Sequence, residues 1–230
     1  PVIGMSRSGA LAEYISVPSA ALKLLPAQVP FEAGASFQAN YLTGLYALEA
    51  RAALQAGEPM LVLGAASGVG TTAIELARQM GATVIAAAST DAKLEVARGI
   101  GADHLINYST QDLRERIKEI TGGKGVDVVY DAVGGPYAEP AVRSLAWKGR
   151  YLVVGFAAGD IPKIPMNLLL LKGAALVGVY FGSFAQREPQ VQLQNVRELW
   201  QLFETGKLRP VVGEVHPLAD FAQAFAALEQ

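Results

Sequence analysis

The sequence predicts an α/β protein whose core is a doubly wound parallel sheet. From Pro59 onward, short apolar runs alternate with segments that have helical periodicity. The apolar runs, such as MLVL at 60–63 and VDVVY at 126–130, are continuous, as expected of strands covered on both faces. Strands separated by single helices favour a parallel sheet with right-handed crossovers.

The individual elements are expected in the following order. A short strand over 9–17 precedes a proline-rich loop and a long helix over 31–54. After the sheet, a helix over 191–204, a strand-like link over 208–218 and a helix over 219–229 close the chain. The strands of the sheet are predicted at 60–63, 83–87, 104–107, 126–131, 150–155 and 175–179, and its helices at 69–80, 92–100, 110–121 and 137–146.

The composition fits a chain with a large buried core. Of 230 residues, 51% are hydrophobic and 17% are charged, and the net charge of −2 suggests no bulk attraction to nucleic acid or anionic lipid. The lack of cysteine excludes disulfides and thiolate metal sites in this segment and fits a reducing, cytoplasmic location. Lys172 and Gly173 interrupt the most apolar stretch, 166–182, which indicates a helix end and a buried strand rather than a membrane span.

A glycine-rich corner follows the first predicted strand of the sheet. In the run AASGVG at 65–70, backbone N–H groups surround a helix N-terminus, which favours phosphate binding. The run occupies the place of a G-x-G-x-x-G fingerprint, with Ala65 and Ser67 instead of the first two glycines. The alternative is a corner that only packs strand against helix. The strand–helix–strand context favours dinucleotide binding.

The end of the second strand distinguishes NADP from NAD. An acidic residue there would bind a free ribose 2′-hydroxyl, but this strand ends at Ser89. Lys93 lies in the first turn of the next helix, where the helix dipole opposes it unless it faces a phosphate. Tyr108, after the third strand, could contact the same group. The alternative is a Thr90 cap, a solvated Lys93 and a rim tyrosine, and Asp91 favours it slightly. We expect NADP.

Other cofactor contacts are expected at the carboxyl ends of the later strands, because ligands bind at that edge of an open parallel sheet. The alternative at each position is a turn glycine beside a core aromatic residue. The segments concerned are 132–134, which includes Val133, then 155–156, and 180–182.

Several stretches together resemble the medium-chain dehydrogenase/reductase superfamily, in its zinc-independent quinone oxidoreductase branch. They cover nearly the whole chain in the order of the family. The matching stretches are GALAEYISVP, NYLTGLYAL, LVLGAASGVGTTAIELARQMGATVIAAAS, GADHLINY, ITGGKGVDVVYDAVGG and GRYLVVGFAAGDIPKIPMNLLLLKGAALVGVYFG.

The resemblance implies an NADPH-binding Rossmann domain at 34–183, with remnants of a GroES-like β-barrel catalytic domain at 1–33 and 184–230. Because the chain begins at Pro1 without Met and ends at Gln230, it is expected to be a fragment. By the pattern of the family, it lacks most of the N-terminal barrel and a C-terminal strand.

The resemblance also implies roles for individual residues. Ser67, Gly68, Val69 and Gly70 would hold the pyrophosphate. Thr43 would lie beside the nicotinamide, and Tyr41 and Thr43 are weak candidates for a catalytic donor. The adenosine 2′-phosphate end would be held by Ser89, Lys93 and Tyr108, and the nicotinamide side lined by Gly155, Phe156, Val179 and Phe181.

A metal is not expected. Zinc-dependent relatives supply a cysteine ligand just before the Rossmann domain, but ASFQANYLTG at 35–44 contains neither Cys nor His. A catalytic zinc needs three protein ligands, and His104 and His216 are far apart in the sequence.

The expected reaction is hydride transfer from NADPH to a quinone or an α,β-unsaturated carbonyl compound. Two alternatives remain open: a non-catalytic NADPH-binding sensor or structural protein, and a zinc-dependent alcohol dehydrogenase relative. A homodimer is expected through the sixth strand, ALVGVYF at 175–181, because proteins avoid a long exposed apolar edge.

Overall fold

The computed structural model describes residues 1–6, 8–27 and 29–228, and it divides into two compact units. The first unit contains Pro1–Gln38 and Arg209–Gln230, and the second contains Ala39–Leu208. The helix α1 (Phe31–Leu45) runs across the boundary at Gln38. The second unit extends beyond the predicted end of the nucleotide-binding domain at residue 183.

The second unit is built on a parallel sheet, as predicted. Within the described residues it has six strands in the order β5-β4-β3-β6-β7-β8, with every neighbouring pair parallel. In chain order this is the 3-2-1-4-5-6 arrangement of a doubly wound dinucleotide-binding fold. The strands are β3 (Pro59–Leu63), β4 (Thr83–Ala88), β5 (His104–Asn107), β6 (Val126–Asp131), β7 (Leu145–Val153) and β8 (Ala175–Gly178).

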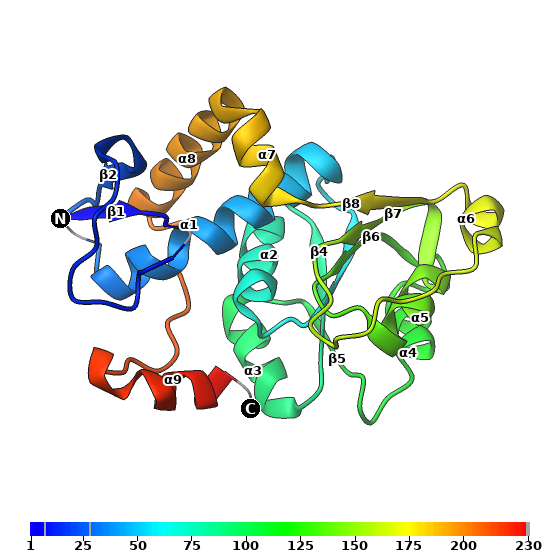
Figure 1. The fold of residues 1–230 in the computed structure, drawn as a ribbon. Helices are drawn as coiled ribbons and strands as arrows, with labels where there is room; N and C mark the ends of the chain where they lie inside the picture. The colour runs from blue at the N-terminus through cyan, green and yellow to red at the C-terminus, as the bar shows by residue number, and fades with distance from the viewer. Residues whose placement is uncertain (7, 28, 229–230) are drawn as a thin grey trace. The chain divides into compact units, whose positions relative to one another are not determined.

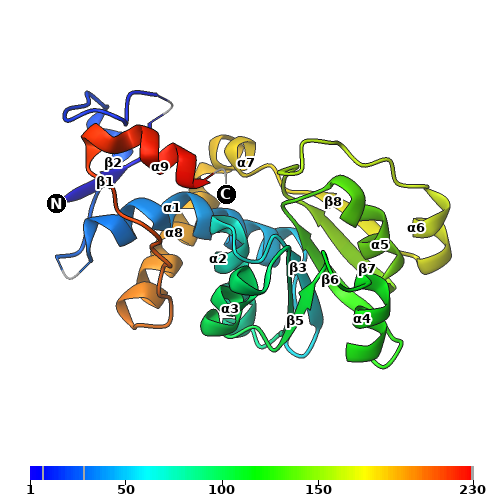
Figure 2. The ribbon, with the colours of Figure 1, turned by 90° about the horizontal axis from the view of Figure 1, so that it is seen from below.

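Helices cover both faces of this sheet (Figures 1 and 2). On one face, Leu61, Ile85 and Val129 share a buried cluster with Ile117 and Val142 from the covering helices. The helices of this face are α4 (Leu113–Ile120), α5 (Ala138–Arg143) and α6 (Asn167–Lys172). The opposite face is covered by α2 (Gly68–Gln79) and α3 (Asp91–Ile100).

Side-chain caps set the starts of three of these helices. The side-chain oxygens of Ser67, Thr90 and Asp112 each accept a backbone N–H in the first turn of α2, α3 and α4. Ser, Thr and Asp are the residues best suited to this position. The helix predicted over 110–121 therefore begins only at Leu113, after its Asp112 cap.

The segment 137–155 differs from its prediction. The expected helix over 137–146 is replaced by the 3₁₀ helix η3 (Gly135–Tyr137) and α5, which ends at Arg143, and β7 begins at Leu145. The N–H of Val126 donates to the carbonyl of Ser144 at 2.9 Å, which draws the chain into the sheet earlier than the apolar pattern indicates.

The strand β8 is an edge strand rather than the buried strand that was predicted. Ala175, Leu176 and Gly178 are exposed, because β8 has a neighbour only on the β7 side. After it come α7 (Phe181–Arg187), which the sequence did not predict, and α8 (Pro189–Glu204). Near the other end of the unit, α1 continues into the π-helix η2 (Tyr46–Arg51).

In the first unit, the predicted strand over 9–17 is wrong. That segment is exposed and irregular, and the antiparallel pair is formed by β1 (Val2–Gly4) and β2 (Leu22–Leu24) instead. A strand needs a neighbouring strand to pair with, and the apolar pattern of 9–17 does not show whether one is present. The link over 208–218 is not a strand either. The unit also contains η1 (Ser19–Ala21), η4 (Leu218–Asp220) and α9 (Phe221–Leu228).

None of the helices in the described ranges combines the length and the apolar character needed to cross a bilayer.

Candidate cofactor-binding site

The predicted site residues of the second unit lie mainly where strands of the parallel sheet end. All six strands run in the same direction, so their carboxyl ends share one edge. Along that edge, the corner at 64–70 follows β3, Ser89 follows β4 and Tyr108 follows β5. Val133 follows β6, Gly155 and Phe156 follow β7, and Val179 and Phe181 follow β8.

The corner between β3 and α2 is held in shape by local hydrogen bonds. The N–H of Ser67 donates to the carbonyl of Gly64 at 2.9 Å, and the N–H of Gly70 donates to the Ser67 hydroxyl at 3.1 Å. Ser67 and Gly68 are exposed, and Val69 is half-buried. As the first two residues of α2, Gly68 and Val69 have N–H groups without an intrahelical acceptor. The corner therefore offers amide donors and the positive end of a helix dipole to an anion.

Two glycines make this close geometry possible. A Cβ atom on Gly70 would lie 2.2 Å from the carbonyl oxygen of Gly64, so α2 can approach β3 only because Gly70 has no side chain. Gly64 has φ +72°, and a Cβ there would lie 2.8 Å from Cγ2 of Val133. Gly64, not Ala65, is thus the tight-turn glycine of the fingerprint. Sequence reasoning missed it, although its place directly after the strand was the available signal.

Asn40 is a second residue that sequence reasoning missed. A Cβ atom on Gly68 would lie 2.7 Å from its Nδ2 atom, so the carboxamide of Asn40 lies directly against the corner. Its backbone carbonyl accepts the Thr72 hydroxyl at 3.3 Å, which ties α1 to α2. The available signal was its place at the start of the stretch NYLTG, just before the predicted residues Tyr41 and Thr43.

Those two residues, Tyr41 and Thr43, are differently placed. Tyr41 is only 2% exposed, and its hydroxyl donates to Glu75 of α2. Burial, followed by the hydrogen bond and charge of Glu75, raises the pKa of Tyr41 well above its usual value. The structure therefore corrects the suggestion that Tyr41 acts as a donor to substrate. Thr43 is half-buried, and its hydroxyl donates to the carbonyl of Ala39 at 2.7 Å.

The structure brings Ser89 and Tyr108 together at the ends of β4 and β5. The Tyr108 N–H donates to the carbonyl of Ala88 at 3.1 Å, and its ring packs on Tyr137 with centroids 4.0 Å apart. Burial raises the pKa of Tyr108, and Tyr137 and Asp131 raise it further. The side chain of Ser89, which lies close by, opposes that increase in the pKa of Tyr108.

Lys93 lies one turn into α3, close to the same strand end. It is half-buried, and its N–H donates to the Thr90 hydroxyl at 3.3 Å, so Thr90 does cap the helix. The neighbouring carboxylate of Asp91 accepts a hydrogen bond of 2.7 Å from Nδ2 of Asn107, which fixes it to the end of β5. The charge of Asp91 is therefore held by a protein donor.

A buried carboxylate organises the loops after β6 and β7. Asp131 is 2% exposed, and its Oδ1 atom accepts the N–H groups of Val133 at 2.7 Å and Gly134 at 2.8 Å. Its other oxygen accepts the hydroxyl of Tyr151, whose pKa is raised by burial and then by the charge of Asp131. The Asp131 carbonyl accepts the N–H of Gly155 at 3.2 Å. Sequence reasoning missed Asp131, although a carboxylate at a strand end was the signal.

The last predicted residues follow β8. Val179 is buried and its N–H donates to the carbonyl of Val153 at 2.9 Å, which extends the sheet by one residue. Phe181 is half-buried at the start of α7, and its ring lies 6.4 Å from that of Phe184. Because β5 and β8 are opposite edges of the sheet, Tyr108 and Phe181 lie at opposite ends of the row of predicted residues.

The two histidines lie apart from this edge. His104 is exposed at the start of β5, and Nε2 of His216 lies 3.1 Å from the carboxylate of Glu214. Across the described ranges, no group of three or more His, Asp or Glu side chains comes together in a way that could hold a metal ion.

Comparison with known proteins shows which family this chain resembles. Residues 68–201 match the family described as zinc-binding dehydrogenase. Quinone oxidoreductase-like protein 2 of Bos taurus is 38% identical over 230 residues, 100% of this chain and 66% of that protein. A 2-haloacrylate reductase from Burkholderia is 43% identical over 185 residues, 80% of this chain and 55% of that protein.

A solved structure gives the same result. The quinone oxidoreductase of Thermus thermophilus, also crystallised in complex with NADPH, matches with a TM-score of 0.88 and 34% identity over 99% of this chain and 72% of that one. The chain thus spans between 55% and 72% of the length of these relatives. With a matching family, similar sequences and the same fold, the chain belongs to the medium-chain dehydrogenase/reductase superfamily, among its quinone oxidoreductase-like members.

Proposed function

We propose that the protein is an NADPH-dependent oxidoreductase that transfers hydride to a quinone or an α,β-unsaturated carbonyl compound, without zinc. The observation that carries the proposal is the corner at Gly64–Gly70. There, exposed amide donors at a helix N-terminus meet a backbone that two glycines keep free of side chains. Those properties suit a pyrophosphate, and Ser67, Gly68, Val69 and Gly70 would hold it.

The preference for NADPH follows from the charges at the end of β4. The strand ends in Ser89 rather than in an acidic residue, and Lys93 supplies a positive charge one turn later. The nearby carboxylate of Asp91 is bound to Asn107, which reduces its repulsion of a 2′-phosphate. Tyr108, with its half-buried ring, would support the adenosine.

The bound nicotinamide would supply the hydride, and the residues of this chain would orient it and exclude water. The N–H of Gly155 is held by the Asp131 carbonyl, and the exposed fraction of the neighbouring Phe156 is 41%, which leaves an apolar surface for a planar ring. Val179 and Phe181 would complete that side, and Thr43 would lie near the nicotinamide. Zinc has no expected role, since the stretch 35–44 offers no Cys or His.

The similarity to a quinone oxidoreductase with an NADPH complex and to a 2-haloacrylate reductase supports both the cofactor and the substrate class. The test is to monitor NADPH oxidation by the full-length protein with 1,2-naphthoquinone and with a simple enone. Turnover that withstands a chelator is expected. Tight NADPH binding without turnover would favour a sensor, and alcohol oxidation that the chelator abolishes would favour a zinc enzyme.

We also propose a homodimer formed through the edge strand β8. Leu176 is 38% exposed and Tyr180 is 76% exposed, so the edge presents apolar side chains and a strand backbone with no second strand beside it, whose Gly178 carbonyl accepts Nε of Arg51 at 3.0 Å. Pairing with a second copy would cover both. Size-exclusion chromatography should show a dimer that Leu176→Lys converts to a monomer, while a monomeric wild type would refute the proposal.

A further inference from the structure

A basic cavity lies at the opposite, amino-terminal edge of the parallel sheet. It has a volume of about 140 Å³, and its walls come from α4, the loop before β6, the end of α5, the start of β7 and the end of α6. Five of its eleven lining residues are basic and only Glu115 is acidic. The basic residues are Arg114, Lys118, Lys124, Arg143 and Lys172.

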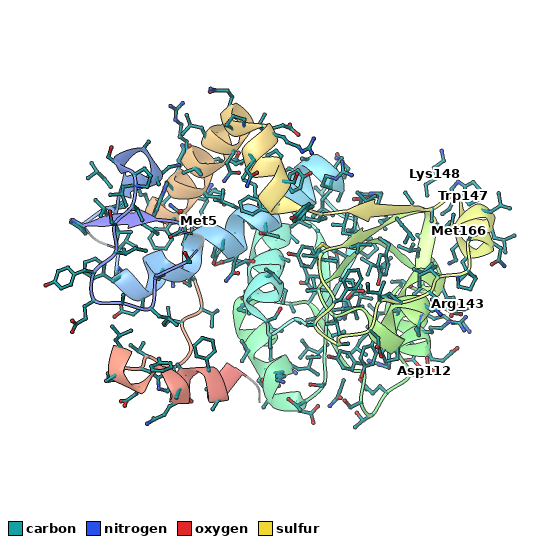
Figure 3. The ribbon with its side chains drawn as sticks, in the orientation of Figure 1. Met5, Asp112, Arg143, Trp147, Lys148 and Met166 are labelled. Carbon is teal, nitrogen blue, oxygen red and sulfur yellow. The ribbon has the colours of Figure 1, made fainter. Side chains whose placement is uncertain are left out.

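This concentration of positive charge is unusual for a chain whose net charge is −2. Arg143, which Figure 3 shows at the end of α5, is paired with Glu139 at 2.6 Å, and Lys118 lies 3.7 Å from Glu115. Within the described ranges, neither Arg114 nor Lys124 forms an ion pair. Opposite charge inside the chain therefore balances only part of the cluster.

The walls of the cavity are held in place by the backbone. The N–H of Gly123 donates to the Lys118 carbonyl at 2.8 Å, and the N–H of Gly125 donates to the Thr121 hydroxyl at 3.0 Å. Gly125 has φ +83°, and a Cβ atom there would lie 2.5 Å from the carbonyl oxygen of Ser144. The loop thus packs tightly against the end of α5, so the cavity exists before any ligand arrives.

Lys172 is directed into this cavity from the end of α6. Its ammonium donates to the carbonyl of Leu145, which leaves further N–H donors for a ligand. Burial lowers the pKa of Lys172, and the nearby charge of Arg114 lowers it further. Two cations thus share one cavity, and an anion placed between them would offset their repulsion and favour the charged form of Lys172.

We propose that this cavity binds a dianionic phosphate group, held chiefly by Lys172 and Arg114. Paired lysine and arginine donors suit a phosphate, and the volume accommodates a tetrahedral oxyanion. The bound phosphate would link α4 and α6 across the starts of β6 and β7. Because it lies at the edge away from the proposed cofactor site, it would stabilise the fold without entering the reaction.

The test is calorimetric titration of the full chain with inorganic phosphate, against sodium chloride at matched ionic strength. Saturable binding is expected, and Lys172→Met and Arg114→Gln should each weaken it by about tenfold or more, the effect of one charged hydrogen bond. Lys163→Gln, which removes a charge outside the cavity, serves as the matched control and should leave the affinity unchanged.

Two further measurements separate this cavity from the corner at Gly64–Gly70. Gly70→Ala should leave phosphate binding intact, and phosphate should raise the pKa of Lys172 as followed by the NMR shift of its Cε atom. A phosphomonoester such as glycerol phosphate should compete, and tighter binding of the ester would show that the phosphate belongs to an organic ligand. The proposal is refuted if phosphate binds no better than chloride, or if only Gly70→Ala abolishes binding.

Discussion

Gly70 in the first turn of α2 packs directly against Gly64 at the end of β3. A Cβ atom on Gly70 would lie 2.2 Å from the carbonyl oxygen of Gly64. No real Cβ contact is that short, so Gly70→Ala must move α2 away from the strand. We expect the free energy of unfolding to fall by about 1–3 kcal/mol, as for other overpacked sites. NADPH affinity should fall at least about tenfold, because the amide donors lose their positions.

Gly99 in α3 provides the matched control, because a Cβ atom there would have no neighbour within 4 Å. Gly99→Ala should raise the free energy of unfolding by up to about 1 kcal/mol through helix propensity and leave NADPH binding unchanged. Chemical denaturation and fluorescence titration measure the two quantities. If Gly70→Ala behaved like Gly99→Ala, the corner would not be the tightly packed pyrophosphate site that we propose.

Lys93→Ala tests the choice of cofactor. Removing a charged hydrogen bond to the 2′-phosphate should cost about 1–3 kcal/mol of NADPH binding free energy and leave NADH binding nearly unchanged. Arg98→Ala removes a positive charge from the same helix, where Arg98 lies 3.2 Å from Glu95, and should affect neither cofactor. Equal losses for NADPH and NADH in Lys93→Ala would rule out the assignment of Lys93 to the 2′-phosphate.

A bidentate ion pair joins the residue before β3 to the strand β7. Nη1 and Nη2 of Arg150 donate to the two carboxylate oxygens of Glu58 at 2.8 and 2.6 Å, and both side chains are about 20% exposed. Arg150→Met leaves that carboxylate partly buried without its cation. We expect the free energy of unfolding at neutral pH to fall by about 3 kcal/mol.

The same pair predicts a dependence on pH. Burial alone would raise the pKa of Glu58, but hydrogen bonds from Arg150 and from the N–H of Gln55 outweigh it and lower the pKa below its usual 4.5. The stabilisation is therefore complete above pH 4.5 and is lost as the pH falls below it. Denaturation at several pH values should show wild type and Arg150→Met converging in acid. Arg98→Gln, at an exposed pair, should change stability by less than about 0.5 kcal/mol.

Much of the sheet could be predicted from the sequence because its strands are buried on both faces. The largely buried strand 126–131 matches its prediction fully, and so does the edge strand 104–107, whose bounds are marked by the residues around it. The predictions are wrong where hydrogen-bonded pairing, rather than the apolar pattern, determines whether a segment forms a strand. The segment 9–17 has the composition of a strand but no partner, and Leu145 joins the sheet because Val126 hydrogen-bonds to the residue before it.

The residues of the candidate site also fall into those that the sequence indicates and those that only the structure reveals. Ser67, Gly70 and Ser89 follow from their places after strands, which one sequence can show. Asn40 and Asp131 had weaker signals, because Asn40 meets Gly68 from a distant part of the chain and Asp131 is buried, and a sequence displays neither property. The hydroxyl of Tyr41 suggests a donor to substrate, yet Glu75, more than thirty positions away along the chain, accepts that hydroxyl in a buried contact between helices.

A pair of carboxylates, Glu49 of η2 and Glu198 of α8, predicts a stabilising substitution. Burial raises the pKa of Glu49, and the charge of Glu198 and a hydrogen bond to it raise it further above 4.5. The fold therefore favours the protonated acid, and stability falls as the pH rises above 4.5. Glu49→Gln keeps the shape without the charge, so its melting temperature should exceed that of wild type at pH 7, and the difference should vanish in acid.

Glu204→Gln, at the exposed end of α8, should show no such gain. A lower melting temperature for Glu49→Gln at neutral pH would mean that the charged form of Glu49 stabilises the contact between η2 and α8.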